Sequence, residues 1–155
     1  MSEIKDKIIL ITGANRGIGK SLSLGFSKLG ANVILLGKDE DSLNGIYDQI
    51  IKTSSTKPLI IQCDLKELDA AGSNQIKEEI LAAYGKLDGV IHNAAILGKM
   101  SSIEDYEERL WKEVFDVNVN SAFLISKEVL PILKNSPMGR IIFTSSGVAE
   151  KGKAY

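Results

Sequence analysis

The feature that most constrains the fold is a regular alternation of short apolar runs with longer amphipathic segments along the whole chain. The apolar runs are nearly continuous in isoleucine, leucine and valine, which is typical of strands that are buried on both faces of a sheet. Five such strands are predicted, at residues 7–12, 32–36, 58–63, 87–92 and 140–144.

Four helices are predicted between these strands, because apolar residues recur there at spacings of three and four. Gly30, at the end of the first predicted helix, suits a left-handed cap, and an acidic cluster favours a helix N-terminus. The helices are expected from Gly19 to Gly30, after the acidic residues 39–41, before Gly85, and from about Tyr106 toward Lys134, where Pro131 would bend or shorten the last turns.

Strands that alternate with helices form a parallel sheet, because each parallel neighbour needs a right-handed crossover. The predicted fold class is therefore α/β: a doubly wound parallel sheet with helices on both faces, in three αβα layers. Residues 1–155 are expected to form one domain, since the sequence has no internal repeat, low-complexity tract or linker.

Charge and composition limit the partners of the chain. Lysine and arginine total 19 and aspartate and glutamate 20, so there is no bulk positive field to attract nucleic acid or acidic lipid. Cys63 is the only cysteine, which leaves it without a partner for a disulfide or a thiolate metal site. No signal sequence or membrane span of ~20 apolar residues is present. We expect a cytoplasmic protein without a metal site, whose partners are small molecules or other protein chains.

The segment ITGANRGIGKS, at residues 11–21, fits two different phosphate-binding motifs. Its glycines suit a dinucleotide-binding turn that presents a pyrophosphate to a helix N-terminus. It also gives A-x-x-x-x-G-K-S, close to the P-loop of nucleotide triphosphatases, in which Lys20 and Ser21 would contact phosphates and magnesium. Asp64 ends a later strand and could hold that magnesium. This segment alone leaves both hypotheses open.

Later segments favour the dinucleotide hypothesis by their order and spacing. The set is TGANRGIG, CDL at 63–65, HNAA at 92–95, DVNVNSAF at 116–123 and IIFTSSG at 141–147. Together these segments resemble the short-chain dehydrogenase/reductase family over the whole chain, whereas the P-loop hypothesis explains only the first two. The resemblance implies a Rossmann-like sheet with strand order 3-2-1-4-5 and a homo-dimer or homo-tetramer.

The resemblance also implies a nicotinamide cofactor. The glycine-rich turn would hold its pyrophosphate, with Ile18 packed beneath it, and Asp64 would accept a hydrogen bond from the adenine amino group. Asn93 and Ala94 match the family's N-A-G, with Ala95 in place of the glycine. A tight turn and a helix cap are the purely structural alternatives for the glycines and for Asp64. The implied cofactor-binding residues are Gly13, Asn15, Arg16, Gly17, Ile18, Gly19, Lys38, Asp64, Leu65, Asn93 and Ala94.

The charge at the end of the second strand bears on the choice of cofactor. NAD enzymes usually place an acid there to hold the ribose 2′-hydroxyl, whereas a 2′-phosphate needs cations. Here the strand ends in Gly37 and Lys38, and Arg16 adds a second cation, while Asp39 lies one residue further on. NADP(H) is therefore favoured over NAD(H).

Asn118 and Ser146 are the candidate catalytic residues by the same resemblance. Asn118 would help to order a water-linked proton relay, and Ser146 would hydrogen-bond the oxygen of a carbonyl or alcohol substrate. His92 is expected to serve in packing or hydrogen bonding. The family's catalytic tyrosine lies about a dozen residues after the serine, in a Y-x-x-x-K segment whose lysine lowers the phenol pKa. Tyr155 follows Ser146 by only nine residues and is not expected to be that acid.

The sequence is therefore expected to be the N-terminal part of a longer enzyme, ending before the Y-x-x-x-K segment, with the apolar side of 106–134 partly bare. Three functions stay open at this point. They are an NADP-dependent short-chain oxidoreductase, a non-catalytic nucleotide-binding or regulatory protein of the same fold, and a P-loop triphosphatase or phosphotransferase.

Overall fold

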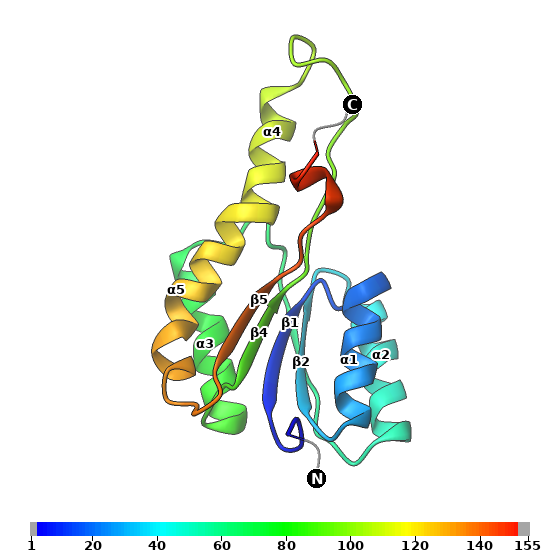
Figure 1. The fold of residues 1–155 in the computed structure, drawn as a ribbon, viewed down its shortest axis with the longest axis vertical. Helices are drawn as coiled ribbons and strands as arrows, with labels where there is room; N and C mark the ends of the chain where they lie inside the picture. Colours follow the sequence, from blue (N-terminus) through cyan, green and yellow to red (C-terminus); the bar gives the residue numbers. More distant parts are fainter. Residues whose placement is uncertain (1–2, 152–155) are drawn as a thin grey trace.

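The computed structural model describes residues 3–151 and shows a parallel sheet between two layers of helices (Figure 1). All neighbouring strands pair in parallel, in the order β3-β2-β1-β4-β5. The predicted fold class, strand order and three-layer arrangement are confirmed, and each strand lies within two residues of its predicted bounds. The strands are β1 (Ile8–Thr12), β2 (Asn32–Gly37), β3 (Leu59–Gln62), β4 (Gly89–His92) and β5 (Arg140–Phe143).

Helices cover both faces of this sheet. Helices α1 (Gly17–Lys28) and α2 (Glu40–Thr53) lie on one face, and α3 (Ala70–Tyr84) and α5 (Ser121–Leu133) lie on the other (Figure 1). Gly30 follows α1 in the predicted left-handed conformation, with φ of 93°. Gly85, where the sequence predicted a helix end, caps α3 in the same conformation, with φ of 68°. Within residues 3–151, no helix combines the length and the apolar character that a bilayer crossing needs.

Two apolar cores result from the alternation of side chains along the strands. Leu10 of β1 belongs to the core beneath α3 and α5, with Ile80 and Ile125. Ile11, the next residue, points to the opposite face and belongs to the core with Ile46 of α2. The central strands are therefore buried on both faces, as their continuous apolar sequence predicts.

The long helix predicted from about Tyr106 toward Lys134 is instead three consecutive segments. Helix α4 (Glu108–Phe115) leads into a π-helical turn, η1 (Asp116–Asn120), and then into α5. The amide of Ser121 donates to the carbonyl of Asp116, five residues earlier, which widens the helix at this point. The predicted span is helical from Glu108 to Leu133 and contains Pro131 in its last turn, but the π-helical turn was not predicted because apolar spacings of three and four do not reveal a single inserted residue.

One side of this helical segment is exposed, as expected from the sequence. The exposed side chains follow one another by about one turn: Trp111, Phe115, Val119 and Phe123. Strand β5 is also largely exposed, although its sequence predicted burial on both faces. It lies at the edge of the described sheet, where β4 is its only neighbour within residues 3–151.

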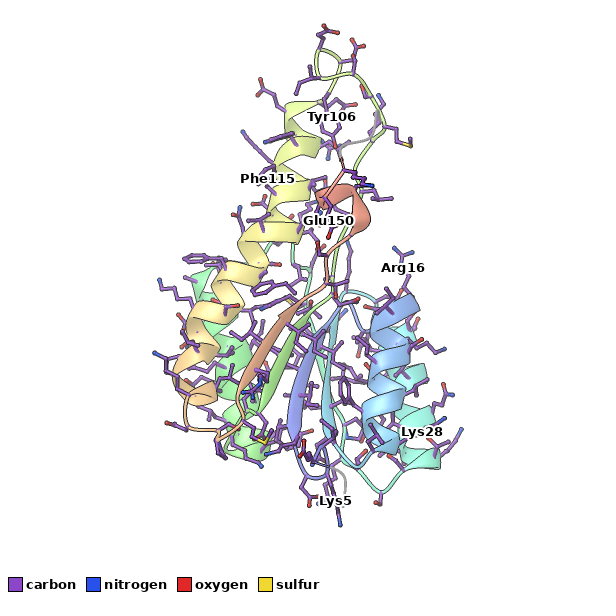
Figure 2. The ribbon with its side chains drawn as sticks, viewed as in Figure 1. Lys5, Arg16, Lys28, Tyr106, Phe115 and Glu150 are labelled. Carbon is purple, nitrogen blue, oxygen red and sulfur yellow. The ribbon has the colours of Figure 1, made fainter. Side chains whose placement is uncertain are left out.

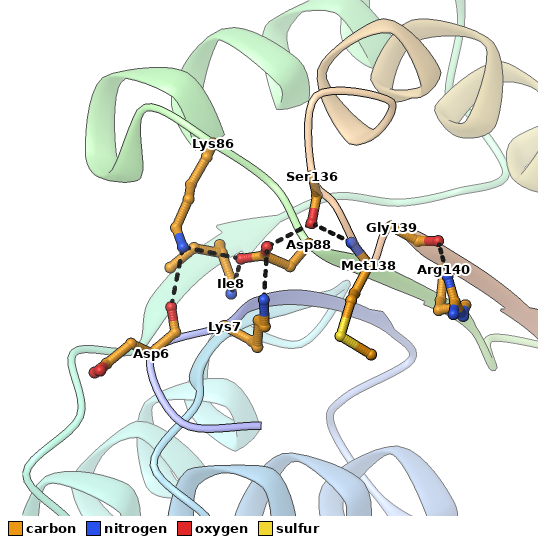
Figure 3. A network of polar contacts seen from close by, with 9 residues as sticks. All are labelled: Asp6, Lys7, Ile8, Lys86, Asp88, Ser136, Met138, Gly139 and Arg140. Carbon is orange, nitrogen blue, oxygen red and sulfur yellow. Dashed lines mark hydrogen bonds and ion pairs between the residues drawn. The ribbon is translucent and has the colours of Figure 1, made fainter. Parts of the chain in front are cut away.

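A buried carboxylate connects three parts of the chain at the amino ends of the strands (Figure 3). Asp88 accepts hydrogen bonds from the Ile8 amide at 3.0 Å and from the Ser136 hydroxyl at 2.7 Å. Lys7 and Lys86 form ion pairs with it at 3.6 and 3.2 Å. Burial opposes its ionisation, but the hydrogen bonds and Lys86 outweigh burial and lower the pKa of Asp88. Asp88 therefore fastens β1 and the turn before β5 to the start of β4.

Candidate cofactor-binding site

A cleft of about 800 Å³ opens at the carboxyl ends of the strands, between β1 and its neighbours. Doubly wound folds bind ligands at this edge, where the strand order reverses, and the volume lies in the usual range for small-molecule sites. Gly19 is buried and packs against Gly13 and Asn93, which line the cleft. Ten of the eleven predicted cofactor-binding residues line it, namely Gly13, Asn15, Arg16, Gly17, Ile18, Lys38, Asp64, Leu65, Asn93 and Ala94.

The glycine-rich turn is tight against β4 and open toward the cleft. Gly13 and Gly17 adopt left-handed backbone, with φ of 67° and 53°. A methyl group on Gly13 would lie 2.8 Å from Cα of Ala94, and one on Gly19 would collide with the carbonyl of Gly13. At Gly17 the same position meets no described atom within 4 Å outside its chain neighbours and its own helix backbone. Because these glycines have no side chains, a phosphate can approach the backbone amides of the turn closely.

The N-terminus of α1 adjoins the cleft. Arg16 occupies the N-cap, and among the described contacts its side chain makes no capping hydrogen bond. The amides of a first helical turn lack intrahelical acceptors, so they can receive an anion. Figure 2 shows Arg16 pointing away from the body of α1 at this end. Ile18 lines the cleft with 61% of its surface exposed, so its side chain is available to pack against a ligand.

The residues required by the P-loop hypothesis lie elsewhere. Lys20 and Ser21 are exposed on α1, and neither is among the described residues that line the cleft. The Ser21 hydroxyl donates to the carbonyl of Gly17 at 3.0 Å, within its own helix. The geometry of this turn therefore favours the dinucleotide hypothesis.

The loop between β2 and α2 is fixed by two contacts of Asp39. Its carboxylate accepts a hydrogen bond from the amide of Ser42 at 2.7 Å, which caps α2. Hydrogen bonding from the Ser42 side chain, and then from its amide, lowers the pKa of Asp39. Its carbonyl accepts a hydrogen bond from the side chain of Asn15 at 2.7 Å. Asn15 thus connects the glycine-rich turn to this loop, while the Asp39 carboxylate caps α2. Lys38 is the charged residue that directly follows β2.

Asp64 and Lys38 meet across the adjacent ends of β3 and β2. The ammonium of Lys38 lies 2.7 Å from Oδ2 of Asp64, and the backbone amide of Lys66 donates to Oδ1 at 3.2 Å. The hydrogen bond between the two side chains lowers the pKa of Asp64 and raises that of Lys38. Leu65, the next residue, is buried in the core beneath α3.

Thr12 holds the strand-end turn that carries Asn93 and Ala94. Its buried hydroxyl accepts hydrogen bonds from the amides of both residues, each at 3.0 Å. The side chain of Asn93 donates in turn to the carbonyls of Thr12 and Gly13, at 3.2 and 3.4 Å. This network joins β1, the glycine-rich turn and β4 at the floor of the cleft. Ala95 follows, exposed at the cleft surface.

Asn118 lies in the π-helical turn and bonds to the loop after β4. Its side chain accepts a hydrogen bond from the amide of Ile96 and donates one to the Ile96 carbonyl, both at 2.9 Å. Ile96 and Val117 line the cleft, so Asn118 lies beside the cleft without being one of its described lining residues. Its contact positions the loop that continues from the floor of the cleft.

Ser146 lies after β5 and is exposed. It precedes a short 3-10 helix, η2 (Gly147–Ala149), and it is not among the described residues that line the cleft. Tyr155 lies outside the described residues. His92 is buried, stacks on Phe143 at 4.9 Å and hydrogen-bonds the hydroxyl of Ser126 at 2.8 Å, so the packing role predicted for it is confirmed.

Several residues at the site were not predicted from the sequence. Thr12 directly precedes the glycine-rich turn, and a hydroxyl at the end of a buried strand was the signal that could have identified it. Glu113 comes from α4, and no sequence pattern connects that helix with the cleft. The further cleft residues missed were Ser42, Cys63, Lys66, Ile96 and Val117.

Known proteins share both the sequence and this arrangement. The profile of the family described as short chain dehydrogenase matches residues 7–155. The chain is 36% identical over 151 residues to an oxidoreductase of Escherichia coli K12 called YciK and described as uncharacterized, covering 97% of this chain and 60% of that protein.

Solved structures agree with the sequence match. A short chain dehydrogenase from Salmonella enterica serovar Typhi has a TM-score of 0.94 at 36% identity, covering 99% of this chain and 64% of that one. A structure from Escherichia coli CFT073 in complex with NADPH has a TM-score of 0.94 at 35% identity, with 99% and 64% covered. The chain therefore spans about 60% of the length of the YciK protein and 64% of these two structures. Its sequence match and its fold together show that this chain belongs to the short chain dehydrogenase family.

Proposed function

We propose that the chain forms the cofactor-binding part of an NADP(H)-dependent oxidoreductase, which exchanges hydride between nicotinamide and a carbonyl or alcohol substrate. The observation that carries this proposal is the charge pattern at the cleft. Arg16 and Lys38 line it together with Asp39, whose carboxylate caps α2. A ribose 2′-phosphate requires such cations, whereas a ribose diol is usually held by an acid at the end of the second strand, where this chain has Gly37 and Lys38. The relative solved with NADPH supports the same choice.

The residues around the cleft fit such a cofactor. The Gly13–Gly19 turn and the first amides of α1 would hold the pyrophosphate, with Ile18 against it. Asp64 and Leu65 would receive the adenine, and Asn93 and Ala94 the ribose near the nicotinamide. The open position at Gly17 leaves room for backbone contact with phosphate, while Gly13 packs against Ala94 with no space for a side chain.

The proposed chemistry divides between cofactor and chain. When bound, the nicotinamide supplies or accepts the hydride. Ser146 would hydrogen-bond the substrate oxygen, and Asn118, through Ile96, would hold the loop beside the reacting groups. We assign the proton donor to a tyrosine outside residues 1–155, since Tyr155 is too close to Ser146 to match the family spacing. A cytoplasmic homo-oligomer is part of the same proposal.

Titration of the purified chain with NADPH, NADH and magnesium-ATP, followed by fluorescence, tests the function. We expect NADPH to bind most tightly. Tight binding of magnesium-ATP without NADPH binding would contradict the proposal.

Reversing the charges of Arg16 and Lys38 tests the argument that these cations select NADP(H). Arg16→Glu combined with Lys38→Glu should weaken NADPH far more than NADH, because only NADPH carries the 2′-phosphate. Lys20→Glu is the matched control, since it reverses an exposed charge on α1 that does not line the described cleft. Equal losses for the two cofactors in the double variant would refute the charge argument.

A further inference from the structure

Lys38 and Asp64 form an ion pair, so a cation and an acid that are both proposed to contact the cofactor are in direct contact with each other. Lys38 follows β2, Asp64 follows β3, and their charged atoms are 2.7 Å apart. Both residues line the cleft. The cation proposed for the 2′-phosphate is thus held by the acid proposed for the adenine.

The two side chains differ in how firmly they are held. Oδ1 of Asp64 accepts a hydrogen bond from the amide of Lys66, so the carboxylate is fixed by its own loop as well as by Lys38. The Lys38 side chain is 74% exposed, whereas that of Asp64 is 32% exposed. The ammonium can therefore turn toward another anion without disturbing the core, and the carboxylate stays in place.

The hydrogen-bonding capacity of each group decides what a ligand can do here. A carboxylate has about four lone-pair sites, so Asp64 can keep Lys38 while it accepts a bond from an amino group. The single charge of Lys38 must instead be shared when a phosphate arrives, and the carboxylate beside it repels that phosphate.

We propose that Asp64 limits the preference for NADP(H) over NAD(H) by competing with the 2′-phosphate for Lys38. The inference rests on the proposed function of the cleft. Asp64 then has two effects of opposite sign, because it attracts the adenine common to both cofactors and weakens the contact made by NADP(H) alone.

The test is the ratio of the NADH and NADPH dissociation constants, measured by titration calorimetry on the full chain. Asp64→Asn keeps an acceptor for the Lys66 amide and removes the charge. We expect both affinities to fall, while the ratio in favour of NADPH rises about two- to fivefold, the range expected for one exposed charge pair. Lys38→Met should lower the ratio, and Asp64→Asn should raise the ratio less in the Lys38→Met background than in the wild type, because only the direct repulsion of the phosphate is then relieved.

Glu67→Gln is the matched control. It removes a negative charge that acts on Lys38 only through space, since the Glu67 carboxylate pairs with Lys66 at 3.6 Å. A wild-type ratio near one would contradict the proposed function itself. If the wild-type chain prefers NADPH but Asp64→Asn leaves the ratio unchanged or lower, the competition is refuted and the NADP(H) preference stands. A rise in Glu67→Gln or in the Lys38→Met background equal to that in Asp64→Asn would also refute it.

Discussion

The side chain of Asn118 pairs with both backbone groups of Ile96, accepting from the amide and donating to the carbonyl at 2.9 Å each. The contact spans 22 residues and joins the π-helical turn to the loop that leaves β4. Backbone N–H and C=O groups need hydrogen-bond partners. The Asn118 side chain supplies both partners for Ile96, as a neighbouring strand does for residues within the sheet. The position of the loop beside the cleft depends on it.

Replacing Asn118 by alanine should release this loop. Two exposed hydrogen bonds are lost, so we expect the free energy of unfolding to fall by about 1 kcal/mol and the Ile96 amide to exchange faster with deuterium. Asn120→Ala is the control, because the Asn120 side chain bonds to Asp116 within the same helical segment. Equal protection of Ile96 in both variants would show that the loop is held by other contacts.

Thr12→Val should damage the floor of the cleft. Valine has nearly the shape of threonine but leaves the amides of Asn93 and Ala94 without their acceptor, which costs about 1–3 kcal/mol. Urea unfolding should report this loss, and NADPH should bind more weakly. Thr12→Ser retains the hydroxyl and should lie close to the wild type in both measurements. A valine variant as stable as the serine variant would contradict the role of the hydroxyl.

Two glycines of α1 should respond oppositely to alanine. At Gly19 the new methyl group would collide with the carbonyl of Gly13, so the variant should lose stability and bind NADPH less tightly. At Gly25 that position meets no described atom within 4 Å outside the neighbouring residues and the backbone of α1 itself, and the backbone is helical. Gly25→Ala should therefore gain about 0.5–1 kcal/mol. Thermal unfolding of the Gly19→Ala and Gly25→Ala variants measures both changes in stability. A loss of stability in Gly25→Ala would contradict the open environment described for this position.

His92 should make stability depend on pH. Burial lowers its pKa to about 4, whereas the unfolded chain takes up the proton near pH 6.5. The unfolded state therefore binds more protons between these values, and stability should fall as the pH drops from about 6.5 to 4, by up to about 3 kcal/mol.

Unfolding of His92→Gln across the same pH range isolates this effect. Glutamine can still bond to Ser126 but does not titrate, so the slope between about pH 6.5 and 4 should become shallower. The remaining decline below about pH 4 should persist, because the lowered pKa values of Asp64 and Asp88 place their protonation there. An unchanged slope above pH 4 would assign the dependence to other groups.

The sequence predicts those parts of the structure that depend on local pattern. Continuous apolar runs identified every strand, and Gly30 and Gly85 marked helix ends correctly. The π-helical turn was missed because it inserts one residue without changing which residues are apolar. Pairings such as Asn118 with Ile96 and Lys38 with Asp64 were also missed, since each joins loops that only the folded sheet brings together.

The place of β1 in the sheet has a consequence for how the chain folds. Ile9 pairs with Val33 of β2, 24 residues away, but with Gly89 of β4, 80 residues away. Closing the longer loop costs about 1 kcal/mol more in chain entropy than closing the shorter one, so β1–α1–β2 can assemble as an early unit while β4 docks late. Since β4 delivers Asn93 and Ala94, the pocket is completed only by that last step, and a chain stalled before it would hold the glycine-rich turn without a floor beneath it.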